Sequence, residues 1–118
     1  MALTIYHNPR CSKSRKTLQI IRDAGIEPNI VLYLEETPSS KRIVDVAGQL
    51  GMRVADLLRS GESQFKQADD LPDLEDDHAL AAWIEAHPKV LERPIVLDED
   101  SGKAVVGRPP ENVAALLS

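Results

Sequence analysis

The segment IYHNPRCSKSRKTLQII, residues 5–21, joins an apolar run to a helical pattern through a polar loop that holds the only cysteine, Cys11. The run Leu3–Tyr6 is rich in strand-forming residues, and the apolar residues of 12–24 recur at helical spacing. A second strand-like run follows at Asn29–Leu34. Because a strand, a helix and a second strand follow one another within about 35 residues, this part of the chain predicts a βαβ unit with parallel strands.

The remainder of the chain adds helices first and strands later. The expected elements are helices at 40–50, 54–61 and 76–86, one more turn at 89–92, a hairpin of strands at 94–100 and 103–107, and a closing helix at 108–118. When the helical insertion at about residues 38–90 is set aside, the order β-α-β then β-β-α is that of a thioredoxin-like sheet. The fold class predicted is therefore α/β with a mixed sheet.

Length and composition indicate an ordinary globular protein. A chain of 118 residues, 42% of them hydrophobic, has the size of one domain covering 1–118 and can bury a core without cross-links. One cysteine cannot form an internal disulfide, and a reducing cytoplasm suits a lone thiol. The start MALTIYH lacks the features of a signal peptide, and no apolar run is long enough for a membrane span. We expect a cytoplasmic monomer.

Charge is unevenly distributed along the chain. The formal net charge is −5, yet residues 1–22 hold five Lys and Arg and none of the 19 Asp and Glu. An acidic protein with one basic segment is a poor general binder of nucleic acid. The cations around Cys11 fit either a small local anion site or a solvated basic helix face, and charge alone does not separate these two.

The position of Cys11 at a loop-to-helix junction favours a reactive thiol. Cysteine reacts as the thiolate, which is stabilised by the unpaired N–H groups at a helix start, by the positive end of the helix dipole and by nearby cations. The amides of Lys13 and Ser14 are within reach of an atom at position 11. Such a junction also binds oxyanions. The alternative is a small buried core residue, which the polar neighbours of Cys11 disfavour.

Two further residues near Cys11 have a functional and a structural interpretation each. The C-x-x-C spacing of thioredoxin-like enzymes ends here in Ser14, which cannot resolve a mixed disulfide, so a catalytic Cys11 would need an external thiol. Ser14 could donate a hydrogen bond to the thiolate or be an ordinary first-turn residue. His7 could polarise the thiol or only cap the strand.

Three arginines are candidate oxyanion ligands. Arg93 and Arg108 each precede a proline at a strand end, where a cis X-Pro bond is one possibility that the sequence leaves open, and Arg59 lies in the helical insertion. Each arginine taken alone is more often a surface charge. The scattered His78 and His87 lack partners at ligand spacing, so no metal site is expected.

Four motifs occur together in an order typical of one family. They are HNPRCSKSR at 7–15, LLRSGE at 57–62, ERPIV at 92–96 and GRPPE at 107–111. Over essentially its whole length the sequence resembles the glutaredoxin-dependent arsenate reductases, above all the short members with the R-C-S-K-S-R signature.

This resemblance implies an oxidoreductase with Cys11 as the nucleophile. It also implies oxyanion ligands at Arg59, Arg93 and Arg108, and places His7 and Ser14 at thiolate-tuning positions. Cys11 would attack arsenate, glutathione would act as co-substrate, and glutaredoxin would remove the glutathione link as arsenite leaves. No bound metal or flavin is expected, since the electrons arrive as thiols.

Two other functions stay open at this point. A glutathione-dependent thiol–disulfide oxidoreductase would use the same cysteine but would not need three arginines. A non-enzymatic regulator of the Spx type would bind RNA polymerase, although such proteins usually carry a full C-x-x-C.

Overall fold

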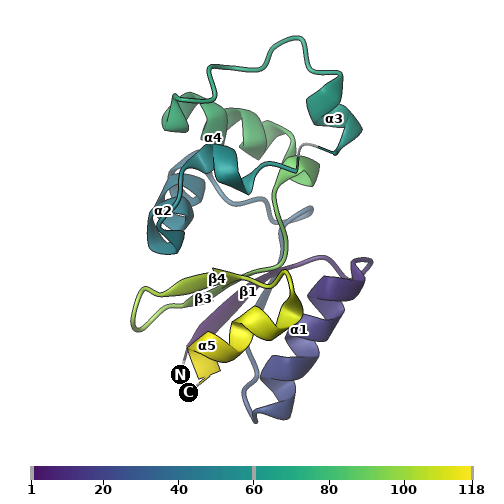
Figure 1. Cartoon of the computed structure of the whole chain (residues 1–118), viewed down its shortest axis with the longest axis vertical. Coiled ribbons are helices and arrows are strands. Elements are labelled where there is room, and N and C mark those ends of the chain that lie inside the picture. The colour runs from purple at the N-terminus through teal and green to yellow at the C-terminus, as the bar shows by residue number, and fades with distance from the viewer. Residues whose placement is uncertain (1, 60, 118) are drawn as a thin grey trace. The chain divides into compact units, whose positions relative to one another are not determined.

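In the computed structural model, which describes residues 2–59 and 61–117, four strands form one mixed sheet in the order β2-β1-β3-β4. The strands are β1 (Leu3–His7), β2 (Asn29–Leu32), β3 (Ile95–Asp98) and β4 (Ala104–Val106). The pair β1–β2 is parallel, whereas β1–β3 and β3–β4 are antiparallel (Figure 1). This α/β arrangement confirms the predicted thioredoxin-like mixed sheet.

The central strand β1 fixes the position of the loop that carries Cys11. All five of its residues are buried, and Ile5 pairs with Ile30 on one side and Val96 on the other. The strand β2 ends at Leu32, two residues earlier than expected, because the Leu32 carbonyl accepts the N–H groups of Glu35 and Glu36, both at 2.8 Å, and so begins a turn.

Helices pack on one face of the sheet. The helix α1 (Ser12–Asp23), the 3₁₀ turn η3 (Pro110–Val113) and α5 (Ala114–Leu117) share one core with β1 and β3. Its buried members are Leu3, Ile5, Leu18, Ile21, Val96, Val113 and Leu116. The closing helix was expected from residue 108, but it starts as η3 at Pro110, since a residue that precedes a proline is disfavoured in the helical conformation and Pro109 is extended with a ψ of 163°.

Residues Thr37–Glu92 form a compact unit of their own, and Met1–Glu36 with Arg93–Ser118 form the other. The first of these contains α2 (Ser40–Leu50), η1 (Val54–Leu57), α3 (Ser63–Lys66), α4 (Asp77–Ala86) and η2 (Pro88–Val90). The predicted insertion falls within this unit. That the two units act as a single domain stays a prediction.

Sequence signals account for the limits of α2. The Ser39 hydroxyl accepts the N–H of Arg42 at the start, and Gly51 ends the helix with a φ of 71°. The short helix expected at 54–61 is only the 3₁₀ turn η1. The backbone becomes extended at Leu58, which pairs with Leu91 in an isolated antiparallel bridge.

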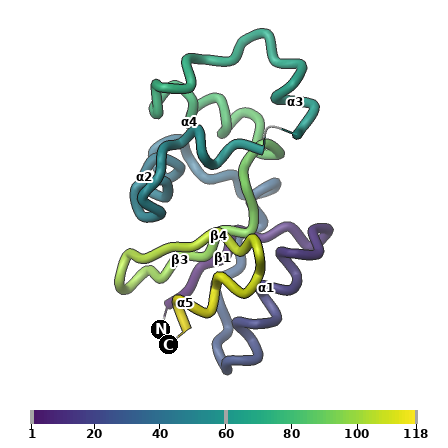
Figure 2. Tube along the Cα trace, in the orientation of Figure 1, coloured from purple at the N-terminus to yellow at the C-terminus, as the bar shows by residue number. Residues whose placement is uncertain are grey.

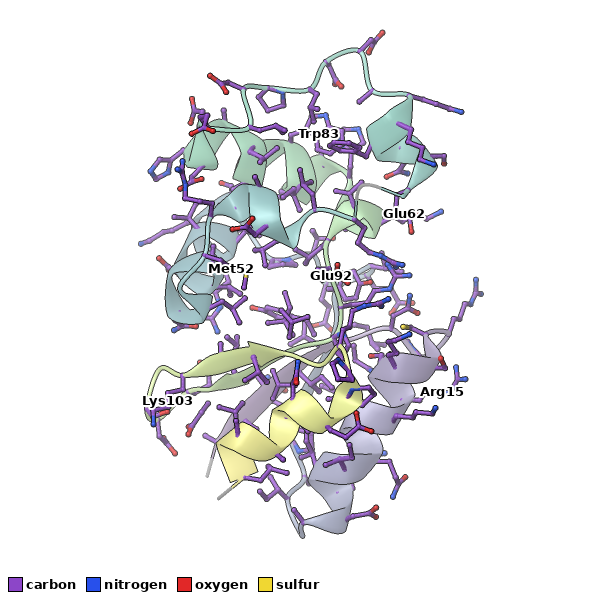
Figure 3. All side chains as sticks on the ribbon, viewed as in Figure 1. Arg15, Met52, Glu62, Trp83, Glu92 and Lys103 are labelled. Atoms are coloured by element: carbon purple, nitrogen blue, oxygen red, sulfur yellow. The ribbon has the colours of Figure 1, made fainter. Side chains whose placement is uncertain are left out.

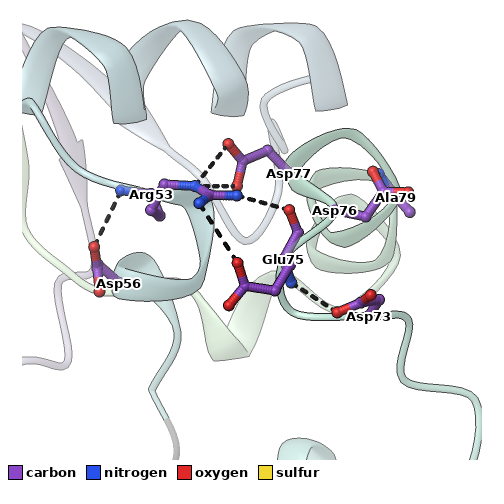
Figure 4. Close-up of polar contacts among 7 residues, drawn as sticks. All are labelled: Arg53, Asp56, Asp73, Glu75, Asp76, Asp77 and Ala79. Atoms are coloured by element: carbon purple, nitrogen blue, oxygen red, sulfur yellow. Dashed lines mark hydrogen bonds and ion pairs between the residues drawn. The ribbon is translucent and has the colours of Figure 1, made fainter.

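Side chains hold the acidic segment between α3 and α4, which follows a wide arc in Figure 2. The Arg53 guanidinium donates to the Glu75 carbonyl at 2.6 Å and meets the Asp77 carboxylate at 3.2 Å (Figure 4). Trp83, which is labelled in Figure 3, is buried and donates from Nε1 to Asp70 at 3.0 Å. No helix within residues 2–59 or 61–117 has the length and apolar character to cross a membrane.

Candidate active site

Cys11 occupies the N-cap position of α1. Its backbone is extended, with φ −93° and ψ 121°, and its N–H donates to the Asn8 carbonyl at 3.0 Å. The Cys11 carbonyl accepts the N–H of Arg15, also at 3.0 Å, which is the first hydrogen bond of the helix. The Asn8 side chain accepts the N–H of Arg10 at 3.0 Å and closes the loop. The thiol is partly exposed, so Cys11 is not a buried core residue.

The surroundings of Cys11 lower the pKa of its thiol. Partial burial works against this and raises the pKa, but the backbone N–H groups of Ser14 and Lys13 and the charge and hydrogen bonding of Arg93 more than offset it. The two amides lie where the sequence predicted. They favour the anion although the Cys11 side chain makes no formal cap hydrogen bond. The thiolate is therefore more populated near neutral pH than in an ordinary cysteine.

The cations next to Cys11 in sequence lie on the protein surface. Arg10, Lys13, Arg15 and Lys16 are all exposed. The Arg15 guanidinium donates to the Pro9 carbonyl at 2.8 Å, and Figure 3 shows this side chain on the outer face of α1. The charged side chain that lowers the Cys11 pKa is instead Arg93, which is remote in sequence. The hypothesis that the four neighbouring cations acidify the sulfur gains no support from this geometry.

His7 and Ser14 lie beneath the Cys11 loop as a buried hydrogen-bonded pair. His7 Nδ1 is 2.6 Å from Ser14 Oγ, and the Asn8 N–H donates to the same hydroxyl oxygen at 3.1 Å. Burial, and to a lesser extent the charges of Arg22 and Arg15, lower the pKa of His7. His7 is therefore neutral at physiological pH. Ser14 is fully buried and connects the strand, the loop and the helix.

Arg93 and Arg108 come together where the chain enters β3 and leaves β4. The bonds Arg93–Pro94 and Arg108–Pro109 are both cis. Arg108 Nη1 donates to the Arg93 carbonyl in a long hydrogen bond of 3.4 Å. Of these two predicted ligands, Arg93 interacts with the Cys11 thiol directly, whereas Arg108 contacts the backbone of Arg93.

Arg59 belongs to the unit formed by Thr37–Glu92. Its N–H donates to the Val90 carbonyl at 2.6 Å, and its Nη1 lies 3.6 Å from a Glu62 carboxylate oxygen. The side chain is 23% exposed, so it is not a freely solvated surface charge. Its approach to the oxyanion stays a prediction.

The described residues contain no candidate set of metal ligands. Within residues 2–59 and 61–117, no three His, Cys, Asp or Glu side chains gather closely enough to hold a metal ion. His87 instead stacks on Trp83, with ring centroids 4.3 Å apart, and its Nδ1 lies 2.9 Å from the Trp83 carbonyl. The chemistry that the site offers is that of a thiolate beside an arginine.

These features define a class: a thioredoxin-like α/β protein that presents one acidified thiol at a helix start, next to a cis-proline turn carrying an arginine. The model of the ArsC family matches residues 6–116. The chain belongs to this family.

Several relatives are similar over nearly the whole chain. An arsenate reductase of Neisseria meningitidis is 43% identical over 117 residues, which cover 98% of this chain and 97% of that protein. A protein of Escherichia coli K12 named uncharacterized protein YfgD is 42% identical, with 96% and 94% covered. The solved structure of an arsenate reductase from Vibrio cholerae has a TM-score of 0.86 at 41% identity, with 98% and 97% covered.

Proposed function

We propose that the protein is an arsenate reductase that produces arsenite, with Cys11 as its nucleophile. The observation that carries this proposal is the partly exposed Cys11 thiol at the N-cap of α1, where the N–H groups of Ser14 and Lys13 and the Arg93 side chain favour the thiolate. A thiolate is needed to attack arsenic, and a guanidinium is suited to hold an arsenate oxygen with paired hydrogen bonds. Support also comes from relatives of similar length that bear the name arsenate reductase.

The reaction begins with the Cys11 thiolate. Its electron pair forms the sulfur–arsenic bond, and one arsenate oxygen departs as water after taking up protons. The thiol of glutathione then attacks the Cys11 sulfur. The electron pair of the sulfur–arsenic bond stays with arsenic, which becomes arsenite, and Cys11 is left in a mixed disulfide. Glutaredoxin removes the glutathionyl group and restores the Cys11 thiol, so two thiols supply the two electrons.

The arginines neutralise charge during the attack. A thiolate and an arsenate anion repel one another, and fixed guanidinium groups lower that barrier without reorganising. Arg93 is suited to hold both the sulfur and an arsenate oxygen because it already interacts with Cys11. Arg108 and Arg59 are proposed to bind other oxygens of the same anion.

His7 and Ser14 tune the thiolate in this proposal. A neutral His7 that carries its proton on Nδ1 donates to Ser14 Oγ, which lies 2.6 Å away. The Ser14 oxygen already accepts the Asn8 N–H at 3.1 Å. Its own hydrogen is then available, and we propose that the Cys11 thiolate accepts it. The lowered pKa of His7 keeps this arrangement in the neutral state.

External thiols follow from the composition. Cys11 is the only cysteine of the chain, so resolution needs a second molecule. Glutathione and glutaredoxin are the proposed partners. No bound cofactor is proposed, and the protein is proposed to act as a monomer in the cytoplasm.

A coupled assay tests this function. Reductant consumption with arsenate, glutathione and glutaredoxin is followed for the wild type and for Cys11→Ser, which we expect to be inactive because serine is a poor nucleophile at neutral pH. Lys103→Ala, an exposed change in the β3–β4 turn, serves as the control. Normal turnover by Cys11→Ser would refute the assignment of the nucleophile.

A second candidate is a glutathione-dependent thiol–disulfide oxidoreductase. The single cysteine with Ser14 three residues later favours it, since one thiol suffices to exchange a glutathionyl group. The same assay with a glutathione mixed disulfide in place of arsenate separates the two candidates. A large rate with the disulfide, together with no arsenate-dependent consumption, would select this second activity.

A further inference from the structure

The backbone between β4 and η3 is closely packed against its neighbours at Gly107. A Cβ atom at this position would lie 2.5 Å from Thr17 Oγ1 and 2.8 Å from the Pro94 ring, so no other residue fits without displacement. The Gly107 N–H donates to the Pro94 carbonyl at 2.8 Å. Gly107 therefore fixes the backbone just before Arg108 against both α1 and the cis-proline turn after Arg93.

Asn112 bridges the same stretch from the other side. Its side-chain Nδ2 donates to the Val106 carbonyl at 3.1 Å and to the Arg108 carbonyl at 3.3 Å. Its backbone N–H donates to the Pro109 carbonyl at 3.0 Å. Asn112 is an exposed residue and not part of the core, yet its amide ties together the carbonyls before and after Gly107.

These contacts determine how Arg108 is held. Its carbonyl is bound by the Asn112 amide, the residue before it is wedged between Thr17 and Pro94, and its Nη1 donates to the Arg93 carbonyl at 3.4 Å. The wedge at Gly107 packs against Thr17 and would survive the loss of Asn112. The Asn112 amide also binds the Arg108 carbonyl and the Val106 carbonyl of β4, so its loss would remove a hydrogen-bonded link that holds the Arg108 backbone to the strand.

We propose that Asn112 is a positioning residue that orients Arg108 toward the oxyanion. The proposal rests on the proposed function, in which Arg108 binds an oxygen of arsenate. Asn112 itself does not touch the substrate. Its loss should weaken the hold on the anion and leave the Cys11 thiol unaffected, because the charged side chain that lowers the Cys11 pKa is Arg93.

The test compares Asn112→Ala with Glu111→Ala, a neighbouring exposed change in the same 3₁₀ turn. We expect Asn112→Ala to raise the arsenate KM about tenfold with a much smaller change in kcat, as for the loss of an interaction that binds the ground state. Asn112→Gln, which keeps an amide donor on a longer side chain, should recover part of that affinity. The pH profile of Cys11 alkylation should be the same in the wild type and in all three variants.

A binding measurement separates this proposal from the proposed function. Protection of Cys11 from iodoacetamide by sulfate, a tetrahedral oxyanion that thiols do not reduce, gives a dissociation constant without turnover. If the wild type is protected but does not consume arsenate, the proposed function fails and this inference is still tested by the sulfate constants of the variants.

Three outcomes would overturn the positioning role. The first is an Asn112→Ala protein with the KM and the sulfate constant of Glu111→Ala. The second is an Asn112→Ala protein in which KM, the pH profile of Cys11 alkylation and the melting temperature all change together, with no recovery in Asn112→Gln. That result would show that Asn112 has only a structural role. The third is a wild type whose Cys11 is protected by no oxyanion.

Discussion

The ionisation of Cys11 is decided by a few atoms. Two of them, the N–H groups of Lys13 and Ser14, follow from local sequence because a helix start always leaves such donors unpaired. The third contribution, from Arg93, depends on the tertiary fold, which brings the entrance of β3 to the start of α1. From sequence, Arg93 was a candidate oxyanion ligand only, and the predicted acidity of the thiol was assigned to the helix start and to neighbouring cations, which prove to be exposed.

Replacing Arg93 should therefore raise the pKa of the Cys11 thiol. In Arg93→Ala the inflection of the iodoacetamide rate against pH is expected to move upward, because a cation that favours the thiolate has been removed. Lys16→Ala removes an exposed cation of α1, the helix that starts after Cys11, and should leave the inflection at the pH of the wild type. Equal shifts in both variants would show that general positive charge, rather than Arg93, acidifies the thiol.

Among the elements, some could be predicted from local patterns and others could not. Local patterns sufficed to predict β1, α1, α2 and α4, because each has a clear apolar period and recognisable end residues. They did not suffice where a long-range pairing or a local turn overrides them. Leu58 leaves the helical pattern to pair with Leu91, and the carbonyl of Leu32 starts a turn within an apolar run.

Two glycines offer a matched comparison of element packing. Gly107→Ala should destabilise the protein by about 1–3 kcal/mol, because the new Cβ would overlap Thr17 and Pro94. Gly48→Ala, in α2 with open space around the position, should stabilise it by about 0.5–1 kcal/mol. Urea unfolding measures both changes. A neutral Gly107→Ala would mean that α1 can shift away from this turn at little cost.

At the scale of the whole molecule, buried His7 links stability to pH. Burial lowers its pKa from the ordinary value of 6.5, so the unfolded chain takes up a proton at a higher pH than the folded protein. The contribution of neutral His7 to the free energy of unfolding is therefore complete above pH 6.5 and is lost as the pH falls through the folded pKa. Each unit of separation between the two pKa values is worth about 1.4 kcal/mol.

In His7→Asn, the free energy of unfolding should fall less steeply than in the wild type as the pH is lowered. This variant should be less stable than the wild type at pH 8 but should lose less stability between pH 7 and pH 5, as measured by urea unfolding at each pH. His78→Asn, a change at an exposed histidine, should keep the slope of the wild type. If His7→Asn keeps that slope as well, the acid sensitivity comes from the many carboxylates instead.

The organisation of the whole chain was harder to predict than its parts. Periodicity located the helical segment, but the compactness of Thr37–Glu92 as a unit is a property of the tertiary structure. In that unit Arg53 joins η1 to the acidic segment before α4, a pairing between residues too far apart for local rules to relate. Of the candidate site, the position of Cys11 at the start of α1 could be predicted because it depends on local sequence, whereas the buried hydrogen bond between His7 and Ser14 was not predicted.

The lone thiol has a kinetic consequence. A protein with a second cysteine can clear its own sulfur at a fixed intramolecular rate, whereas this chain has none to spare. Once Cys11 is occupied, it stays so until a molecule from solution collides with it, and the waiting time shortens in proportion to the supply of free thiols. The fraction of Cys11 found modified in a cell would thus report how far its thiol pool has been depleted.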